Sequence, residues 1–304
     1  MWFEEDAKKN PLADGYAEDY CNASSKLRFD KDVWDELIDN MSEAGINMLV
    51  IDLGEGVRYE THPEIAVKGS LSVEELYREL QVIRSKGIIP IPKLNFSTAH
   101  DEWMGEYSRC VSSRKYYEVC KDLINEVIEI FDTPPYFHLG MDEETNIHQL
   151  HNRYAVIRHG DLWWHDLYYL ADIVGKKGVR PWVWSDYIWN HEAEFLQKMP
   201  KEILQSNWYY SGAFTRETDR LKSYNILSEH GYDQIPTGSN WSCQWNFEGT
   251  VNYCLDTCNN DLIKGFMQSV WRPTVREVRF RHLEAIDIVR QVKRNYISKY
   301  NEAA

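Results

Sequence analysis

The sequence lacks the features that carry a protein into a membrane or onto a nucleic acid. No apolar run approaches the roughly 20 residues that cross a bilayer. The first ten residues, MWFEEDAKKN, lack the basic and apolar segments of a secretory signal. Basic residues are scarce, with 34 Lys and Arg against 48 Asp and Glu and a formal net charge of -14. Because nucleic acids and anionic membranes attract basic proteins, we expect neither partner, and we expect a cytoplasmic location.

The sequence also has none of the short motifs that bind nucleotides or activate a serine. It contains no G-x-G-x-x-G or P-loop segment and no G-x-S-x-G elbow. Its six cysteines form neither a C-x-x-C pair nor a zinc-like spacing. We therefore expect no cofactor, and free, mostly buried thiols in a reducing compartment. The cysteines are Cys21, Cys110, Cys120, Cys243, Cys254 and Cys258.

What the sequence does have is enough apolar material for a large core. Of its 304 residues, 43% are hydrophobic, and no low-complexity tract interrupts them. A chain of this length forms either one large domain or two small ones. Since no linker stands out, we predict a single domain over residues 1–304.

One local pattern recurs three times along the chain, at 44–53, 86–95 and 177–186. Each segment gives a helix end, a glycine suited to the position after the last helical turn, and a short apolar strand. Before the second segment, Ser72 and Glu75 have the spacing of a capping box, which predicts a helix start. The pattern therefore indicates helices that lead into buried strands.

Further elements follow the same alternation of strand and helix. We expect strands at 2–4, 136–139, 203–206, 234–237 and 262–270, and helices at about 115–131, 161–176, 191–199, 216–230, 249–259 and 276–298. About eight strands alternating with helices favour an α/β protein with a closed parallel (β/α)8 TIM barrel. A doubly wound open sheet is the alternative.

The stretch FHLGMDEET at 137–145 places three carboxylates directly after an apolar run. Side chains alternate along a strand, so His138 and Asp142 would face the barrel axis. Glu143 would lie just past the strand end, where the loop can turn it back over the mouth of the barrel. A helix N-terminus, where acidic residues are favoured, would account for Glu144. Two carboxylates would thus meet where TIM barrels carry their active sites.

Aromatic residues collect at the other predicted strand ends. Aromatic rings beside carboxylates suit a sugar-binding cleft, because sugar C–H faces stack on rings while the hydroxyls bond to polar groups. For any single tryptophan, a place in the core is an equally good interpretation. The residues that follow the fifth to eighth predicted strands are Trp184, Asp186, Trp208, Tyr209, Tyr210, Asn240, Trp241, Trp245 and Trp271.

The string from His138 to Glu143 resembles the H-x-G-x-D-E signature of glycoside hydrolase family 20, the β-N-acetylhexosaminidases. The catalytic domain of that family is a (β/α)8 barrel with this motif at the end of its fourth strand. Residues 91–95 with His100 are similar to the family's third-strand stretch P-E-I-D-x-P-G-H. Trp184 and Trp271 fall where the family places tryptophans that cradle the sugar.

This resemblance implies substrate-assisted hydrolysis of a β-glycosidic bond, in which the 2-acetamido oxygen of the substrate attacks C1. Asp142 would hold the acetamido N–H, and Glu143 would protonate the leaving oxygen and then activate water. The negative charge of Asp142 would raise the pKa of Glu143. His100 would pair with Asp52 and orient Glu143, with His138 as a further supporting residue.

The sequence departs from the family pattern at several positions. Lys93 and Asn95 replace Glu and Asp, and residues 238–241 read Gly-Ser-Asn-Trp where the family has a tyrosine and an aspartate that grip the acetamido group. Arg272 and Pro273 stand where an acidic residue is usual. The sugar could therefore lack a 2-acetamido group, in which case a separate carboxylate would be the nucleophile.

Three alternatives to the hexosaminidase hypothesis stay open. A glycosidase without substrate assistance would take its nucleophile from Asp186 or Glu4. A metal-dependent barrel hydrolase or isomerase would use Glu144, His148 and His151, whose spacings suit a metal on one helical face. A carbohydrate-binding barrel without activity would keep only the aromatic cleft.

Overall fold

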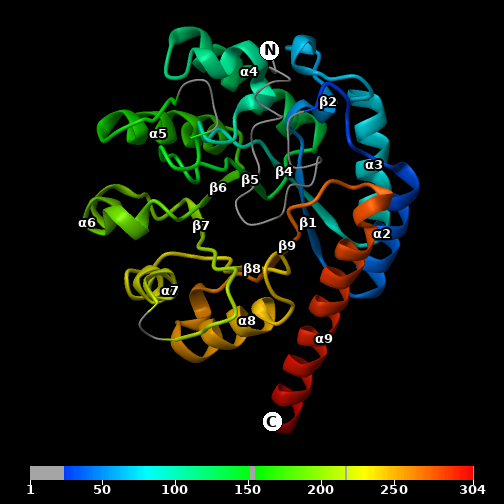
Figure 1. Cartoon of the computed structure of the whole chain (residues 1–304), viewed down its shortest axis with the longest axis vertical. Coiled ribbons are helices and arrows are strands. Elements are labelled where there is room, and N and C mark those ends of the chain that lie inside the picture. Colours follow the sequence, from blue (N-terminus) through cyan, green and yellow to red (C-terminus); the bar gives the residue numbers. More distant parts are fainter. Residues whose placement is uncertain (1–23, 151–154, 216–217, 304) are drawn as a thin grey trace. The chain divides into compact units, whose positions relative to one another are not determined.

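The computed structural model describes residues 24–150, 155–215 and 218–303, over which strands and helices alternate (Figure 1). The strands are β1 (Met48–Asp52), β2 (Val57–Arg58), β3 (Leu71–Ser72), β4 (Ile89–Lys93), β5 (Tyr136–His138), β6 (Arg180–Trp184), β7 (Leu204–Ser206), β8 (Thr237–Ser239) and β9 (Met267–Ser269). The α-helices are α2 (Lys31–Glu43), α3 (Val73–Ser85), α4 (Arg114–Ile130), α5 (Asp161–Lys176), α6 (Ile188–Lys198), α7 (Asp219–Glu229), α8 (Asn246–Thr257) and α9 (Arg279–Ala303). The predicted first strand, 2–4, lies outside the described residues.

The contacts of the chain divide it into two compact units. The first contains β1 to β5, α3 to α5 and most of β6, and its main segments are Met48–Ser85 and Ile89–Val183. The second contains α2 and everything described from Trp184 onward. The assignment of residues 1–304 to one domain stays a prediction.

Strands β1, β4 and β5 of the first unit run parallel and end level with one another. β1 pairs with β4 from Met48 opposite Ile89 to Asp52 opposite Lys93, and Lys93 is also opposite His138 of β5. The carboxyl ends of these strands therefore form one edge, and the segments after β4 and β5 start side by side from it. This edge is the place where parallel α/β proteins gather functional residues.

Helix α3 shows how the local sequence builds this unit. Ser72 and Glu75 form the predicted capping box, with 2.8 Å from Ser72 N to Glu75 Oε2 and 3.2 Å from Glu75 N to Ser72 Oγ. Leu76, Leu80 and Ile83 recur at helical spacing and are buried. Burying each such side chain contributes about 1.5 to 3 kcal/mol.

No helix in the described ranges is both long and apolar enough to cross a membrane.

In the second unit, β8 pairs in parallel with β9, and isolated bridges extend the parallel order back to β7 at Gln205 opposite Gln234. The predicted strand 234–237 is shifted, since β8 begins only at Thr237. Pro236 precedes it and has no N–H to donate, although its carbonyl accepts from Met267 N at 3.0 Å. Of the predicted strand 262–270, only Met267–Ser269 forms a strand, which is β9.

Candidate active site

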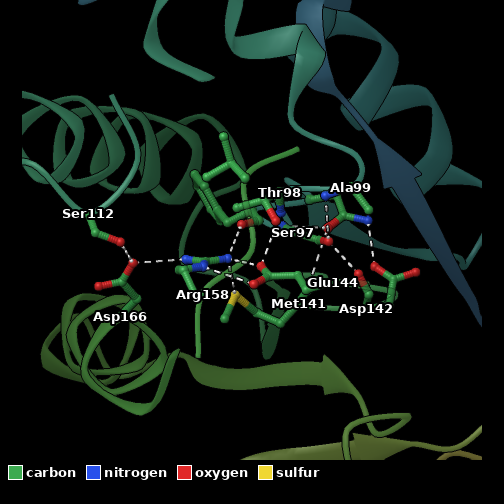
Figure 2. A network of polar contacts seen from close by, with 12 residues as sticks. Ser97, Thr98, Ala99, Ser112, Met141, Asp142, Glu144, Arg158 and Asp166 are labelled. Carbon is green, nitrogen blue, oxygen red and sulfur yellow. Dashed lines mark hydrogen bonds and ion pairs between the residues drawn. The ribbon is translucent and has the colours of Figure 1, made fainter. Parts of the chain in front are cut away.

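Asn95 joins the segments that follow β4 and β5. Its Nδ2 donates to Asp142 Oδ1 at 2.8 Å, and its Oδ1 accepts from Ser97 N at 3.0 Å and Met141 N at 3.3 Å. The Ser97 hydroxyl also donates to the main-chain carbonyl of Asp142 (Figure 2). Asp142 is thus fixed through both its carboxylate and its backbone.

Gly140, the glycine of the H-x-G-x-D-E string, lies where the segment after β5 approaches Asn95. Its φ is +74°, and a Cβ at this position would lie 1.9 Å from Asn95 Oδ1. Only glycine lets the two segments approach so closely. The next residues keep turning, because Met141 and Glu143 also have positive φ, at 71° and 58°. The regular strand therefore stops at His138, and the turn rather than the strand alternation sets the direction of Glu143.

His138, the last residue of β5, contacts the turn that follows the strand. Gly140 N donates to His138 Nδ1 at 3.0 Å, which leaves the hydrogen of the neutral ring on Nε2. Burial, together with the positive charge of Lys93, lowers the pKa of His138 well below its usual value. The ring packs against Trp182 at 4.8 Å between centroids. His138 is therefore a neutral structural residue in this arrangement.

Two imidazoles hold the carboxylate of Glu143. His100 Nε2 lies 3.1 Å from Glu143 Oε2, and His148 Nε2 lies 3.1 Å from Oε1. His100 also contacts Asp142 Oδ2 at 3.5 Å, so it bridges the two acidic residues. The carboxylate pair and its bridging histidine form the core of the candidate site.

These contacts reverse the predicted shift in the pKa of Glu143. Burial raises the pKa, but hydrogen bonds from His100 and His148 outweigh that effect and lower it to about 2. For His100, burial lowers the pKa, yet the negative charges of Asp142 and Glu143 prevail and raise it to about 9. The prediction of a raised pKa for Glu143 is wrong, because it considered Asp142 and not the histidines.

Asp52 does not pair with His100, contrary to the prediction. Its carboxylate forms an ion pair with Lys93, the residue opposite it in the strand register. The Lys93 side chain is buried, and a buried ammonium needs an anionic partner. Within the described residues, the charged partners of His100 are Asp142 and Glu143.

Glu144 is not at a helix N-terminus, since residues 139–144 are irregular. Its carboxylate is buried against Arg158, which also pairs with Asp166 of α5 (Figure 2). This excludes Glu144 from the predicted metal set with His148, and His151 lies outside the described residues. No local pattern in the sequence points to Arg158, which is 14 residues away.

A cation could be held instead by His100, Asp142 and Glu143. One ligand atom from each of the three lies within 4.8 Å of the others. A metal would require the neutral form of His100, whereas the neighbouring carboxylates favour the imidazolium. A proton on His100 therefore competes with any cation for this position.

The aromatic candidates all belong to the second unit and differ in burial. Trp184 is 2% exposed and Trp271 is 38% exposed, with 5.7 Å between their ring centroids. Trp208 is largely buried and stacks on Tyr210 at 4.9 Å. The guanidinium of Arg272 lies 3.9 Å from the ring centroid of Trp241. Trp184 and Trp208 thus behave as core residues, while Trp271 presents a ring to solvent.

Asp186 and Asn240 are also buried. Asn240 Nδ2 donates to Arg281 O at 3.0 Å and to Glu284 Oε2 at 2.8 Å. Both partners can only accept, so the amide orientation is fixed and its hydrogens are already engaged. The sequence reasoning missed Glu284, which lies 44 residues further along the chain. Glu4 lies outside the described residues.

No family model matches the sequence, and no curated protein matches it either. Solved structures do match in fold. The β-N-acetylhexosaminidase from Bacteroides fragilis NCTC 9343 has a TM-score of 0.60 at 17% identity, over 86% of this chain and 63% of that one. The family 20 exo-β-N-acetylglucosaminidase from Vibrio harveyi in complex with N-acetylglucosamine has a TM-score of 0.61 at 15% identity, over 86% and 52%.

The family 20 β-N-acetylhexosaminidase from Streptomyces coelicolor A3(2) has a TM-score of 0.63 at 13% identity, over 86% of this chain and 62% of that one. The chain thus spans half to two thirds of the length of these proteins. Parallel strands alternate with helices, and the matched catalytic domains are (β/α)8 barrels, so the predicted fold class is confirmed. The resemblance to family 20 is confirmed at the level of the fold.

Proposed function

We propose that the protein is a glycoside hydrolase that cleaves the β-glycosidic bond of an N-acetylhexosamine by substrate assistance. The observation that carries this proposal is the pairing of Asp142 and Glu143 beyond the carboxyl ends of β4 and β5, bridged by His100. The fold likeness to family 20 enzymes supports it. The complex of the Vibrio harveyi protein with N-acetylglucosamine supports a carbohydrate ligand.

In the proposed reaction, the carbonyl oxygen of the 2-acetamido group attacks C1 while the bond from C1 to the leaving oxygen breaks. Asp142 accepts a hydrogen bond from the acetamido N–H and stabilises the positive charge of the cyclic intermediate. Its Oδ1 is oriented by Asn95, which fixes the carboxylate before the substrate arrives. Water then attacks C1 and breaks its bond to the acetamido oxygen. This step opens the ring that the acetamido group had formed and releases the sugar with its acetamido group intact.

Glu143 protonates the leaving oxygen and later takes a proton from the attacking water. Its contacts with His100 and His148 keep its pKa low and its carboxylate ionised, so the substrate has to weaken a histidine contact before Glu143 can carry a proton. We expect the leaving group to replace His148 at Oε1, because His148 belongs to a partly exposed turn while His100 is also held by Asp142. Loss of that contact raises the pKa of Glu143.

The sugar-binding residues of this proposal come from the segments after β6 to β9. Trp271 and Trp241 present rings for stacking, while Asp186 and Tyr210 offer polar groups for hydroxyls. Trp184 and Trp208 would act by supporting Trp271 and Tyr210, against which their rings pack. Asn240 would contribute through its carbonyl oxygen, since its amide hydrogens are engaged.

The test is a screen of nitrophenyl glycosides with and without a 2-acetamido group on the purified protein. The proposal requires turnover of a β-N-acetylhexosaminide and at most weak turnover of the matching sugar without the acetamido group. Efficient hydrolysis of the second sugar would point to a separate nucleophile such as Asp186. Binding without any turnover would leave a carbohydrate-binding barrel.

A metal-dependent hydrolase is a second candidate, favoured by the close approach of the ligand atoms of His100, Asp142 and Glu143. Treatment with EDTA separates the two. Substrate-assisted hydrolysis needs no metal and should keep its rate, whereas a metal-dependent reaction should stop and recover when a divalent cation is added back.

A further inference from the structure

A buried ion cluster adjoins the proposed catalytic pair. The side chains of Arg158, Glu144 and Asp166 are 1%, 5% and 0% exposed. Arg158 Nε lies 3.1 Å from Glu144 Oε2, and Arg158 Nη1 lies 3.0 Å from Asp166 Oδ2. Figure 2 shows the guanidinium between the two carboxylates. Charges this deeply buried are expensive unless they are paired, so the cluster holds its members in one arrangement.

The cluster connects both segments that carry the site. Arg158 Nη2 donates to the carbonyl of Phe96 at 2.7 Å, and Thr98 N donates to Glu144 Oε1 at 3.0 Å. Phe96 and Thr98 flank Ser97, whose hydroxyl holds the backbone of Asp142. The segment after β4 and the segment after β5 are therefore joined through Glu144 and Arg158.

Glu143 needs such support because its backbone is strained. Its φ of 58° is unfavourable for any residue with a Cβ, by about 1 to 2 kcal/mol. A conformation of this kind persists only when neighbouring residues are fixed. Asp142 on one side is held by Asn95 and Ser97, and Glu144 on the other side is held by Arg158 and Thr98.

The far side of the cluster is anchored in α4, in α5 and in the turn that precedes α4. Asp166 of α5 accepts hydrogen bonds from the hydroxyls of Ser112, at 2.6 Å, and Tyr117 of α4. Asp166 thus fixes Arg158 against the helical layer, and its hydrogen bonds are with Arg158, Ser112 and Tyr117 rather than with residues 94–98 or 139–144. The two carboxylates of the cluster have different neighbours although they share one guanidinium.

We propose that Glu144 and Arg158 are positioning residues that hold Glu143 in the direction required for proton transfer. Neither touches the substrate in this proposal, and both act through the backbone on either side of Glu143. The effect on catalysis rests on the proposed function. The effect on the position of Glu143 does not, and it can be measured without a substrate.

The chemistry of the neighbours provides a matched pair of variants, Glu144→Gln and Asp166→Asn. Each removes one negative charge from the same cluster without changing its size, and each leaves Arg158 with one carboxylate. The partners of Glu144 are Thr98 N–H and Arg158, which can only donate, so the amide of a glutamine must break one contact. The hydroxyl partners of Asp166 can accept as well as donate, so an asparagine can keep all of its contacts. Removal of Arg158 itself would leave two buried carboxylates without their cationic partner and would destabilise the fold.

The first measurement is the NMR titration of His100, whose pKa of about 9 depends on its contacts with Asp142 and Glu143. If Glu144 positions Glu143, then Glu144→Gln should lower the pKa of His100 toward its ordinary value, while Asp166→Asn should leave it close to that of the unchanged protein. Equal values in both variants, with unchanged melting temperatures, would overturn the proposal whether or not the protein hydrolyses any glycoside.

The second measurement compares substrates with good and poor leaving groups. A misplaced proton donor matters most when the leaving oxygen is basic, so Glu144→Gln should lower kcat for an unactivated disaccharide by roughly tenfold to a hundredfold. Its kcat for a nitrophenyl glycoside should fall less, because only the attack of water then needs Glu143. Both KM values, and all values for Asp166→Asn, should change by less than about threefold. An equal loss on both substrates indicates a general structural role and would reject the positioning role. If the unchanged protein cleaves neither substrate, the proposed function fails and the His100 titration alone decides on Glu144.

Discussion

At the scale of single residues, Glu143 carries the proposed proton transfer. Glu143→Gln keeps the size and hydrogen-bonding groups of the side chain but cannot donate a proton. We expect hydrolysis of substrates with poor leaving groups to fall by a factor of roughly 10² to 10⁴, while binding is largely kept. Steady-state kinetics and calorimetric titration check this. Turnover close to that of the unchanged protein would remove Glu143 from the mechanism.

The His100–Glu143 contact should also give the protein a defined pH dependence of stability. The pKa of His100 is raised to about 9 from about 6.5, so its contribution is fully present below pH 6.5 and is lost as the pH rises through 9. The pKa of Glu143 is lowered from 4.5 to about 2, so its contribution is present above pH 4.5 and is lost as the pH falls through 2. We expect His100→Gln to reduce both the loss of unfolding free energy at high pH and the loss at low pH.

Denaturant unfolding across this pH range gives the required free energies. His159→Gln is the control, because His159 lies in the same unit and its side chain is exposed. The expectation fails if the two variants show the same slopes of unfolding free energy against pH.

At the scale of elements, the turn after β5 depends on Gly140. Gly140→Ala introduces a Cβ that would lie 1.9 Å from Asn95 Oδ1 and 2.8 Å from Asn95 Cα, so the two segments must separate. Gly178, at the joint between α5 and β6, has a nearly equal φ of +75°, but no atom lies within 4 Å of the position that a Cβ would take there. Gly178→Ala should therefore cost only the backbone strain of about 1 to 2 kcal/mol.

We expect Gly140→Ala to lose clearly more unfolding free energy than Gly178→Ala and to lose activity as well. Thermal and denaturant unfolding of both variants, with turnover measured in parallel, provide the comparison. Equal losses in the two variants would mean that contact with Asn95 does not constrain the turn.

The strand-end tryptophans separate into a buried and an exposed class. Trp184→Ala removes a side chain that is 2% exposed and should cost about 3 to 5 kcal/mol of unfolding free energy. Trp271→Ala removes a ring that is 38% exposed and should weaken sugar binding with a much smaller effect on stability. Melting curves and ligand titrations of both variants test this. A stability loss at Trp271 as large as that at Trp184 would assign Trp271 to the core.

At the scale of the whole molecule, the fold is shared with family 20 enzymes although identity is 13–17% for the three proteins compared. If substrate assistance is also shared, a thiazoline mimic of the cyclic intermediate should bind far more tightly than the monosaccharide. Asp142→Asn should lower both turnover and thiazoline affinity, because it removes the charge that stabilises the intermediate. Inhibition constants for both proteins check this. Thiazoline binding no tighter than that of the sugar would reject substrate assistance.

Much of the architecture could be read from neighbouring residues. The capping box of Ser72 and Glu75, the glycine joints between helices and strands, and the apolar periodicity of α3 depend on contacts within a few residues, which local sequence determines. The strand limits near Pro236 were less predictable, because parallel pairing depends on partners far along the chain. The H-x-G-x-D-E string likewise marked the candidate site, since its glycine and its two acids are adjacent in sequence.

The sequence by itself therefore determined the alternating α/β architecture and the position of the acidic pair after β5. The tertiary structure decided which charged groups pair. Lys93 pairs with Asp52, Arg158 pairs with Glu144, and His148 contacts Glu143 together with His100. These partners are between 5 and 43 residues apart, and sequence spacing does not give the distances between them. Because the free energy of a charge depends on those distances and on burial, only the folded chain could set the low pKa of Glu143.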